Sequence, residues 1–314
     1  MIKKSRDKIV VVGAGNVGIT VAYTLMLKRL SSDIVIIDVD KDKAHGNVLD
    51  MKHGIAFYRQ LSIKDGTYED CKDASMVIIT AGVARRSGQS RLELAQTNIK
   101  IMKDIVRNVV KHNDDTMIIV VSNPVDALTY VAQKESGLPA SQVIGTGTLL
   151  DTSRFRYFLG QYFDSDIRDI NAYIIGEHGD TQVPIWSGVT IAGERIDDVC
   201  NDTGKVLDRE KIFTRTRDSG AEVISLKGAT NYGIALLVGR IVSAILDDEH
   251  TVLPVTHVLD EEYGISDVAL SLPCIITRNG IKRVVDLHLN EKELEELKTS
   301  ATTMKTFLHK SLVD

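Results

Sequence analysis

The sequence has few cysteines, no long apolar run and no excess of positive charge. Its three cysteines lie far apart without a C-x-x-C pair, which argues against a disulfide or zinc framework and favours a reducing cytoplasm. No stretch approaches the roughly 20 apolar residues of a membrane span, and the apolar run at 9–12 behind the basic amino terminus is too short for a signal peptide. The formal charge of −5 gives no reason to bind nucleic acid or an anionic membrane. We therefore expect a small-molecule partner.

The residues that are present suffice for two folded domains. At about 150 residues per domain, 314 residues correspond to two, and an apolar fraction of 43% supplies a core for both. In the first half, strands are predicted at 8–12, 34–38, 76–81 and 117–122, and helices at 17–30 and 98–112. Apolar strands without polar alternation are typical of parallel sheets covered on both faces. We expect an α/β fold with a Rossmann-type doubly wound parallel sheet over 1–145.

The pattern changes to mixed strands and long helices after residue 143. A strand is predicted at 171–175, and helices at 214–226, 229–247 and 291–309. These elements predict a second, α+β domain over 146–314, expected to carry the catalytic residues. Because no Pro/Gly-rich linker marks the boundary, we expect the two domains to share a broad interface.

A glycine-rich turn provides the cofactor signal. Gly13-Ala-Gly15-Asn-Val-Gly18 follows the first predicted strand and opens the first helix, so backbone N–H groups and the helix dipole can face a pyrophosphate. Asp38 ends the next predicted strand, where a carboxylate accepts hydrogen bonds from a ribose diol and repels a 2′-phosphate. Ordinary turns and loop-capping aspartates are the alternative. The combination favours NAD over NADP.

One histidine stands apart from the others. His178 lies between glycines in Gly176-Glu-His-Gly-Asp180, directly after the predicted strand 171–175. Asp151 and Arg154 are three residues apart at the start of a predicted helix and face the same way, so the carboxylate can orient and charge an imidazole. A helix cap and a surface salt bridge are the alternatives for these two. Seven other histidines are expected in surface positions: His45, His53, His112, His250, His257, His288 and His309.

These residue types suit the reduction of a 2-keto acid. Its carboxylate needs a bidentate cation, which the Arg154 guanidinium supplies better than an ammonium. The alkoxide left by hydride addition needs a proton donor near neutral pH, and histidine has the nearest ordinary pKa. Arg91 ends the glycine-bounded segment 82–91, which we expect to close as a lid over bound substrate.

The chain resembles the L-lactate/malate dehydrogenase superfamily over essentially its whole length, and within it the bacterial L-lactate dehydrogenases. The matching segments are Val11-Val-Gly-Ala-Gly, Thr80-Ala-Gly, Ser90-Arg-Leu, Val121-Ser-Asn-Pro-Val-Asp126, Val143-Ile-Gly-Thr-Gly, Leu150-Asp-Thr-Ser-Arg-Phe-Arg156, Gly176-Glu-His-Gly-Asp180 and Lys227-Gly-Ala-Thr230. The resemblance implies NADH-dependent reduction of pyruvate to L-lactate by a homotetramer.

The resemblance also implies the roles of individual residues. His178 is the acid/base with Asp151 as its partner, Arg154 binds the substrate carboxylate, and Arg91 polarises the carbonyl. Asn123 contacts both substrate and nicotinamide, and Thr230 lines the substrate pocket. The implied cofactor residues are Gly13, Gly15, Val17, Gly18, Asp38, Lys43, Tyr68, Gly82, Ser122, Asn123, Thr146 and Ile234.

Two positions depart from the lactate-type pattern. Arg85 stands where lactate dehydrogenases usually carry glutamine and malate dehydrogenases arginine, so oxaloacetate reduction or dual specificity is the alternative, unless Arg85 and Arg86 are surface residues. Arg156 matches an arginine that binds fructose 1,6-bisphosphate in many bacterial relatives, but Asn171 replaces its histidine partner, which predicts weak activation. A dinucleotide-binding protein without catalysis is a further alternative. An NAD-dependent glycosidase is not favoured, because we find no suitably spaced metal-binding residues.

Overall fold

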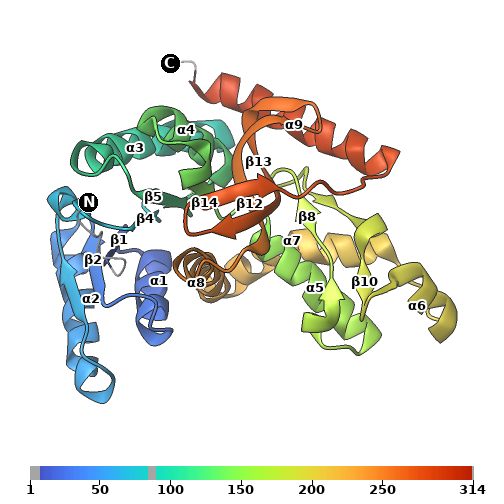
Figure 1. Ribbon diagram of the computed structural model, residues 1–314, viewed down its shortest axis with the longest axis horizontal. Helices are drawn as coiled ribbons and strands as arrows, with labels where there is room; N and C mark the ends of the chain where they lie inside the picture. The colour runs from blue at the N-terminus through green and yellow to red at the C-terminus, as the bar shows by residue number, and fades with distance from the viewer. Residues whose placement is uncertain (1–7, 84–89, 313–314) are drawn as a thin grey trace.

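A nine-stranded sheet forms the centre of the molecule in the computed structural model, which describes residues 8–83 and 90–312 (Figure 1). Six strands are parallel and lie in the order β3-β2-β1-β4-β5-β6. They are β1 (Lys8–Val12), β2 (Asp33–Ile37), β3 (Ser62–Asp65), β4 (Met76–Ile79), β5 (Met117–Val120) and β6 (Val143–Gly145). The strand order reverses between β1 and β4, and ligands of such sheets bind beyond the carboxyl ends at this point. The expected doubly wound Rossmann-type sheet is confirmed.

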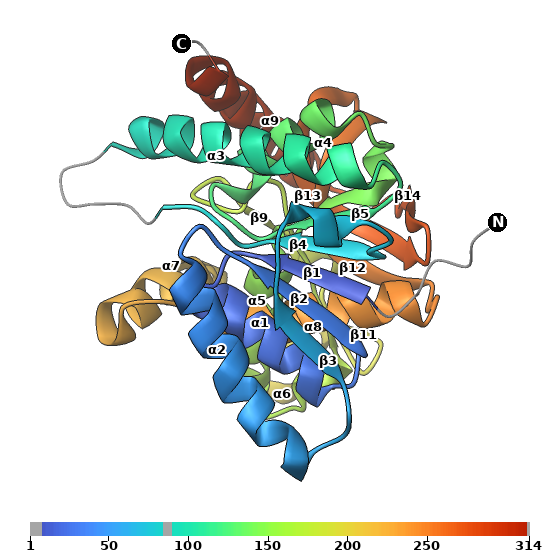
Figure 2. The same ribbon diagram turned by 90° about the vertical axis from the view of Figure 1, so that its left-hand side faces the viewer.

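Helices cover both faces of this sheet. Figure 2 shows α1 (Asn16–Leu27) and α2 (Lys41–Gly54) on one side of the strands and α3 (Arg91–His112) and α4 (Val125–Ser136) on the other. In β1, Ile9 and Val11 pack into one buried cluster, whereas Val10 and Val12 pack into the cluster on the opposite face. The strands are therefore apolar throughout, as the absence of polar alternation predicts.

The second half of the chain extends the same sheet. The strands β12 (Thr251–Glu262), β13 (Ile265–Thr277) and β14 (Gly280–Val284) are antiparallel, and Thr256 of β12 pairs with Gly145 of β6. The expected broad contact between the two halves thus includes backbone pairing within one sheet.

In the rest of the second half, the helix at 232–246 packs beside α1 on one face of the sheet, and the helix at 291–312 lies across the top and contacts α3. The other elements lie on the right of the view in Figure 1. The helices are α5 (Leu149–Phe163), α6 (Ile196–Thr203), α7 (Arg209–Lys227), α8 (Tyr232–Leu246) and α9 (Glu291–Leu312). One small sheet contains β7 (Ile170–Asn171), β10 (Thr190–Ile191) and β11 (Glu194–Arg195). A second contains β8 (Ile174–Ile175) and β9 (Val183–Pro184). Short 3₁₀ turns are η1 (Ile55–Phe57), η2 (Tyr68–Cys71), η3 (Ala140–Gln142), η4 (Ile167–Asp169) and η5 (Trp186–Gly188). None of the helices in the described ranges has both the length and the apolar character needed to cross a bilayer.

Three details differ from the sequence prediction. Helix α3 begins at Arg91 rather than at residue 98, because Ser90 and Glu93 form a capping box: Ser90 Oγ accepts from Glu93 N, and the Glu93 carboxylate accepts from Ser90 N. Helix α1 ends at Leu27 rather than at residue 30, and Arg29 adopts a left-handed φ of 59°. The predicted strand 171–175 was wrong as a single strand: β7 and β8 pair with different partners, Thr190 and Pro184 among them.

The surface assignment of His257 was also wrong. Its side chain is buried between β12 and β13, with Nδ1 3.6 Å from Cys274 Sγ and Nε2 3.9 Å from Glu262 Oε1. The acidic run at 260–262 favoured an exposed position, although the nearer residues Val255, Val258 and Leu259 are apolar and typical of a buried strand. The long strand pairing of β12 with β13 buries it instead.

Candidate active site

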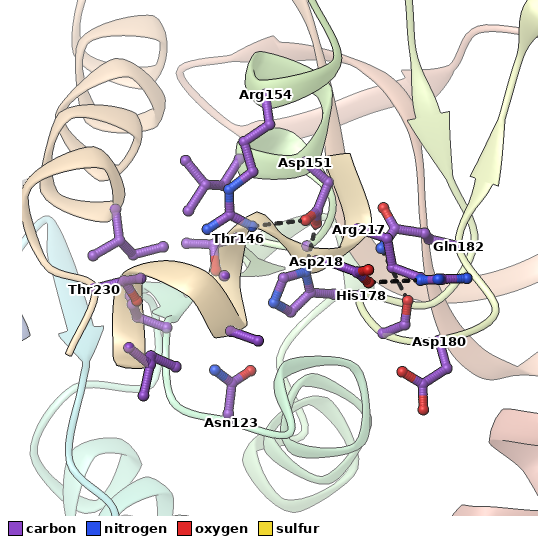
Figure 3. Close-up of a pocket in the computed structure, with 18 of the residues that line it drawn as sticks. Asn123, Thr146, Asp151, Arg154, His178, Asp180, Gln182, Arg217, Asp218 and Thr230 are labelled. Atoms are coloured by element: carbon purple, nitrogen blue, oxygen red, sulfur yellow. Dashed lines mark hydrogen bonds and ion pairs between the residues drawn. The ribbon is translucent and has the colours of Figure 1, made fainter. Parts of the chain in front are cut away.

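A cavity of about 720 Å³ collects the predicted substrate-binding residues. It lies beyond the carboxyl ends of β5 and β6, and helices α5, α7 and α8 contribute to its wall. Of the residues singled out from the sequence, nine line it: Val17, Arg91, Asn123, Thr146, Asp151, Arg154, His178, Thr230 and Ile234. Segments from both halves of the chain therefore meet at one site, as Figure 3 shows.

The Asp151 carboxylate contacts two side chains of the site, one through each oxygen. The His178 Nδ1 lies 2.5 Å from Asp151 Oδ2, and Arg154 Nη1 donates to Asp151 Oδ1 at 3.0 Å. Both Asp151 and Arg154 belong to the first turns of α5, so their spacing of three residues puts them on one face. The sequence predicted this grouping, and the structure brings the three side chains together (Figure 3).

Burial makes these contacts strong. The Asp151 side chain is only 2% exposed and that of Arg154 16%, so water screens their charges weakly. Burial alone raises the pKa of Asp151, but the charges and hydrogen bonds of His178 and Arg154 outweigh it and lower that pKa. The negative charge of Asp151 raises the pKa of His178 to about 9 against the opposing effect of burial. The imidazole is thus held in its charged form at neutral pH.

The free edges of these groups face the cavity. Because Nδ1 of His178 bonds to Asp151, Nε2 is the ring nitrogen that is available to a ligand. Arg154 uses one N–H on Asp151, and a guanidinium has five N–H donors in a fixed fork. The site therefore offers an acidic N–H and a planar cation to the same small volume.

Arg91 reaches the mouth of the cavity. As the first residue of α3, it pairs with Asp180 through Nη1 and Oδ2 at 2.7 Å, and both side chains are exposed. Arg85 and Arg86, on which the choice between pyruvate and oxaloacetate was expected to depend, lie outside the described residues. Their prediction is untested.

The glycine turn has the shape required by a dinucleotide. Gly13 has a φ of +111°, and a Cβ on Gly18 would come within 1.8 Å of Gly13 O, so both positions require glycine. Gly15 caps α1 without a side-chain hydrogen bond and borders open space. Asp38 accepts from Ala14 N at 2.5 Å and from Asp40 N at 2.8 Å, which fixes its carboxylate beside the turn. This arrangement fits NAD, with an anion at the helix start and a ribose diol at Asp38.

Besides the glycine turn and Asp38, four further predicted cofactor residues lie outside the described lining of the large cavity. Ser122 Oγ donates to Ala81 O at 2.6 Å and is buried. Gly82 packs against the Asn98 side chain. Lys43 is in the first turn of α2, and burial raises the pKa of Tyr68 to about 12. Their assignment to cofactor binding remains a prediction.

Sequence reasoning did not assign several polar residues around the site. Buried Asn98 donates to Asn123 O at 2.8 Å and to Val83 O, and its Oδ1 accepts from Val83 N, so it ties α3 to the segment carrying Asn123. An asparagine that interrupts the apolar face of a helix was the signal for it. Asp180 and Gln182, in the loop between β8 and β9, and Arg217 and Asp218 of α7 also line the cavity. The signal for Arg217 and Asp218 was weaker, since charged residues on a helix usually face solvent.

The expected bisphosphate residues lie close together. Arg156 Nε donates to Ala172 O at 3.0 Å, and its guanidinium lies 5.3 Å from the centre of the Tyr173 ring. Asn171 is exposed in β7. No second cation is supplied by Asn171, so weak activation by fructose 1,6-bisphosphate stays our prediction.

Comparisons with known proteins agree with this geometry. Residues 7–145 match the family model described as lactate/malate dehydrogenase, NAD binding domain, and residues 148–312 match the lactate/malate dehydrogenase, alpha/beta C-terminal domain. The L-lactate dehydrogenase of Acetivibrio thermocellus is 46% identical over 96% of each chain, and L-lactate dehydrogenase 1 of Clostridium acetobutylicum is 46% identical over 97% of this chain and 98% of its own.

Solved structures resemble the whole chain as well. A lactate dehydrogenase, MGS-M5, from a Medee basin deep-sea metagenome library has a TM-score of 0.94 and 41% identity, covering 98% of this chain and 99% of its own. The minor L-lactate dehydrogenase of Enterococcus mundtii has a TM-score of 0.94 and 39% identity over the same shares. The expectation of NAD as cofactor is confirmed by the family model of the first half. The chain belongs to the lactate/malate dehydrogenase family.

Proposed function

We propose that this protein is an NAD-dependent L-lactate dehydrogenase that interconverts pyruvate and L-lactate. The observation that carries the proposal is that His178 and Arg154 both contact the same carboxylate, that of buried Asp151. These side chains line a cavity next to the dinucleotide turn. An arginine and a protonated histidine side by side suit a substrate that has a carboxylate next to a carbonyl. The relatives named L-lactate dehydrogenase support it.

The chain's own residues perform binding and proton transfer. Arg154 binds the carboxylate of pyruvate in a bidentate manner, which sets the carbonyl towards His178. The bound cofactor supplies hydride. His178 Nε2–H donates its proton to the carbonyl oxygen as negative charge develops there, and Asp151 stabilises the imidazolium before transfer. Arg91 adds positive charge at the same oxygen once it leaves Asp180. Asn123 and Thr230 complete the substrate wall.

The direct test compares two substrates side by side. NADH oxidation is followed with pyruvate and with oxaloacetate under one set of conditions. Pyruvate reduction at a typical dehydrogenase kcat/KM, above about 10⁴ M⁻¹s⁻¹, supports the proposal. Reduction of oxaloacetate alone would assign the chain to malate dehydrogenation instead.

Arg85 is the residue that favours the second candidate function, malate dehydrogenation. An arginine there supplies a counter-charge to the second carboxylate of oxaloacetate, which pyruvate lacks. We therefore expect both activities, and Arg85→Gln should move the ratio of kcat/KM values towards pyruvate by more than about tenfold, equivalent to about 1.4 kcal/mol. Arg86→Gln is measured alongside, because it shows which of the two adjacent arginines sets the ratio. An unmoved ratio in Arg85→Gln would remove the support for malate and make Arg86 the next position of interest.

The pH dependence of pyruvate reduction follows from the charged His178. Since its pKa is raised to about 9, the proton-donating form persists through neutral pH. We expect kcat/KM for pyruvate to be level below about pH 9 and to fall above it, with a tenfold loss per pH unit. Asp151→Asn removes the largest cause of the raised pKa, so the break should move down towards the ordinary value near 6.5. Steady-state pH profiles of both enzymes decide the point; a break that stays in place would contradict the pairing.

We extend the proposal to a homo-oligomer, a tetramer by resemblance. Helices α1, α2, α7 and α8 carry exposed apolar side chains, with Tyr23 at 46%, Leu226 at 79% and Tyr232 at 68% exposure. Tyr23 and Tyr232 also line a groove of about 620 Å³ on this side. Such a patch is typical of a protein interface. A domain boundary near residue 145 and a cytoplasmic location complete the proposal.

A further inference from the structure

A second carboxylate, besides that of Asp151, contacts His178 through its main chain. Asp126, in the first turn of α4, is 2% exposed, and its Oδ2 accepts from the backbone N–H of His178 at 2.7 Å. It ends the segment Ser122-Asn-Pro-Val-Asp126, whose Asn123 lines the cavity. Asp126 itself does not line that cavity in the described chain. It therefore acts on His178 from within the protein.

The other oxygen of Asp126 belongs to a buried chain of hydroxyl groups. Thr256 Oγ1 donates to Asp126 Oδ1 at 2.6 Å and lies 2.8 Å from Ser271 Oγ, which accepts from Thr148 N at 3.0 Å. Thr148 is the N-cap residue of α5, the helix that carries Asp151 and Arg154. One network thus links the backbone of His178 to the start of the helix that holds its partner.

Charged groups surround His178 and Asp126, and Arg91, Asp180, Arg217 and Asp218 line the same cavity as His178. His178 is faced by Asp151 and Arg154 from α5 and by Asp126 from α4, and the charge of Asp126 is a further cause of its raised pKa. Burial raises the pKa of Asp126 to about 6, against the hydrogen bonds from Thr256 and His178, while Glu177 adds to the rise. Above that pH the carboxylate is charged, and its nearest titratable partner of opposite sign is His178.

We propose that Asp126 is a positioning residue for the acid/base histidine: it holds the main chain of His178 and adds a second buried negative charge that keeps the imidazole protonated. The proposal rests on the proposed function only in taking His178 as the acid/base. Both oxygens of the carboxylate accept hydrogen bonds here, and its negative charge is the property that an amide lacks. An amide in its place can keep both contacts if the Thr256 hydroxyl reverses, accepting from the amide and donating to Ser271.

The variant Asp126→Asn therefore removes the charge with little change of shape. We expect the pKa of His178 to fall by about one pH unit. This is the size of shift expected when a buried charge that accepts a hydrogen bond from the residue's own main chain is removed. Two readouts report it: the alkaline break of kcat/KM for pyruvate, and the rate at which diethyl pyrocarbonate modifies His178 between pH 6 and 10, followed by peptide mass spectrometry. The second readout needs no turnover.

Two control variants separate charge from structure. Thr256→Val removes a hydrogen bond to Asp126 and keeps its charge, so the pKa of His178 should stay within about 0.2 units of the wild type. Glu135→Gln removes an acid from the same helix α4, where it pairs with Arg107 away from the cavity, and should leave both readouts unchanged. A pKa of His178 that is unmoved in Asp126→Asn, or that falls equally in Thr256→Val, overturns the charge effect.

The wild-type protein gives an independent measurement should Asp126→Asn fail to fold. The His178 amide should exchange with deuterium at least about 100-fold more slowly than a free peptide, because its N–H donates to a buried carboxylate. Exchange at the free-peptide rate would overturn the positioning role. Failure of the proposed function would give a different result, namely near-native turnover in His178→Asn. The modification and exchange rates of His178 in the wild type and in Asp126→Asn do not depend on turnover and are measured separately.

Discussion

Replacing His178 with Asn should lower the turnover of pyruvate by about two to four decades, the range for a lost general acid. Asparagine keeps the size and polarity of the side chain but has no proton to give to a developing alkoxide. The buried Asp151, which Arg154 still contacts at 3.0 Å, loses its cationic imidazole partner. The loss should appear in kcat as well as in kcat/KM, because proton transfer occurs only in the chemical step.

NADH binding separates this result from simple unfolding. Among the described residues, the His178 ring bonds to Asp151, and Asp38 bonds to Ala14 of the dinucleotide turn. A fluorescence titration with NADH should therefore give a nearly unchanged Kd. The exposed His288 offers a matched control, and His288→Asn should behave as wild type in both assays. Near-native turnover in His178→Asn would make the acid/base assignment wrong.

The local features of this site could be predicted from the sequence because each depends on neighbours along the chain. The Gly13 turn follows directly from its place between a strand and a helix, and the pairing of Asp151 with Arg154 follows from helical spacing. The parallel sheet with helices on both faces then follows from the alternation of strands and helices. These features need no knowledge of distant contacts.

Features that depend on distant strand pairing could not be predicted. Asp126 meets His178 across 52 positions and Thr256 across 130. The pairing of β12 with β6 places Thr256, and the bridge between Gly176 and Ser271 ties the segment before His178 to β13. His257 is buried against Cys274 of the neighbouring strand β13, a contact 17 positions away in the sequence. Helical spacing and turn chemistry carry no information about which residue of a distant strand lies opposite.

Arg154→Lys should raise the KM for pyruvate by about 30- to 150-fold, with a smaller effect on kcat. A lysine keeps the charge but cannot form the two parallel N–H···O bonds of a guanidinium. Losing one charge-assisted hydrogen bond costs about 2–3 kcal/mol, which corresponds to this range in affinity. Because the carboxylate is bound both before and during the chemical step, the loss falls mainly on binding.

The environment of Arg154 makes a split between KM and kcat informative. Its Nη1 also contacts Asp151, so a lysine there that still pairs with Asp151 leaves the charge balance around His178 nearly intact. The exposed Arg168, which pairs with Asp166, provides the matched control: Arg168→Lys should change neither constant. Should Arg154→Lys instead lower kcat, leave KM unchanged and shift the alkaline break, then Arg154 acts through Asp151 and His178 and does not bind the substrate carboxylate. A selective rise in KM is the result that the fork geometry of a carboxylate-binding guanidinium requires.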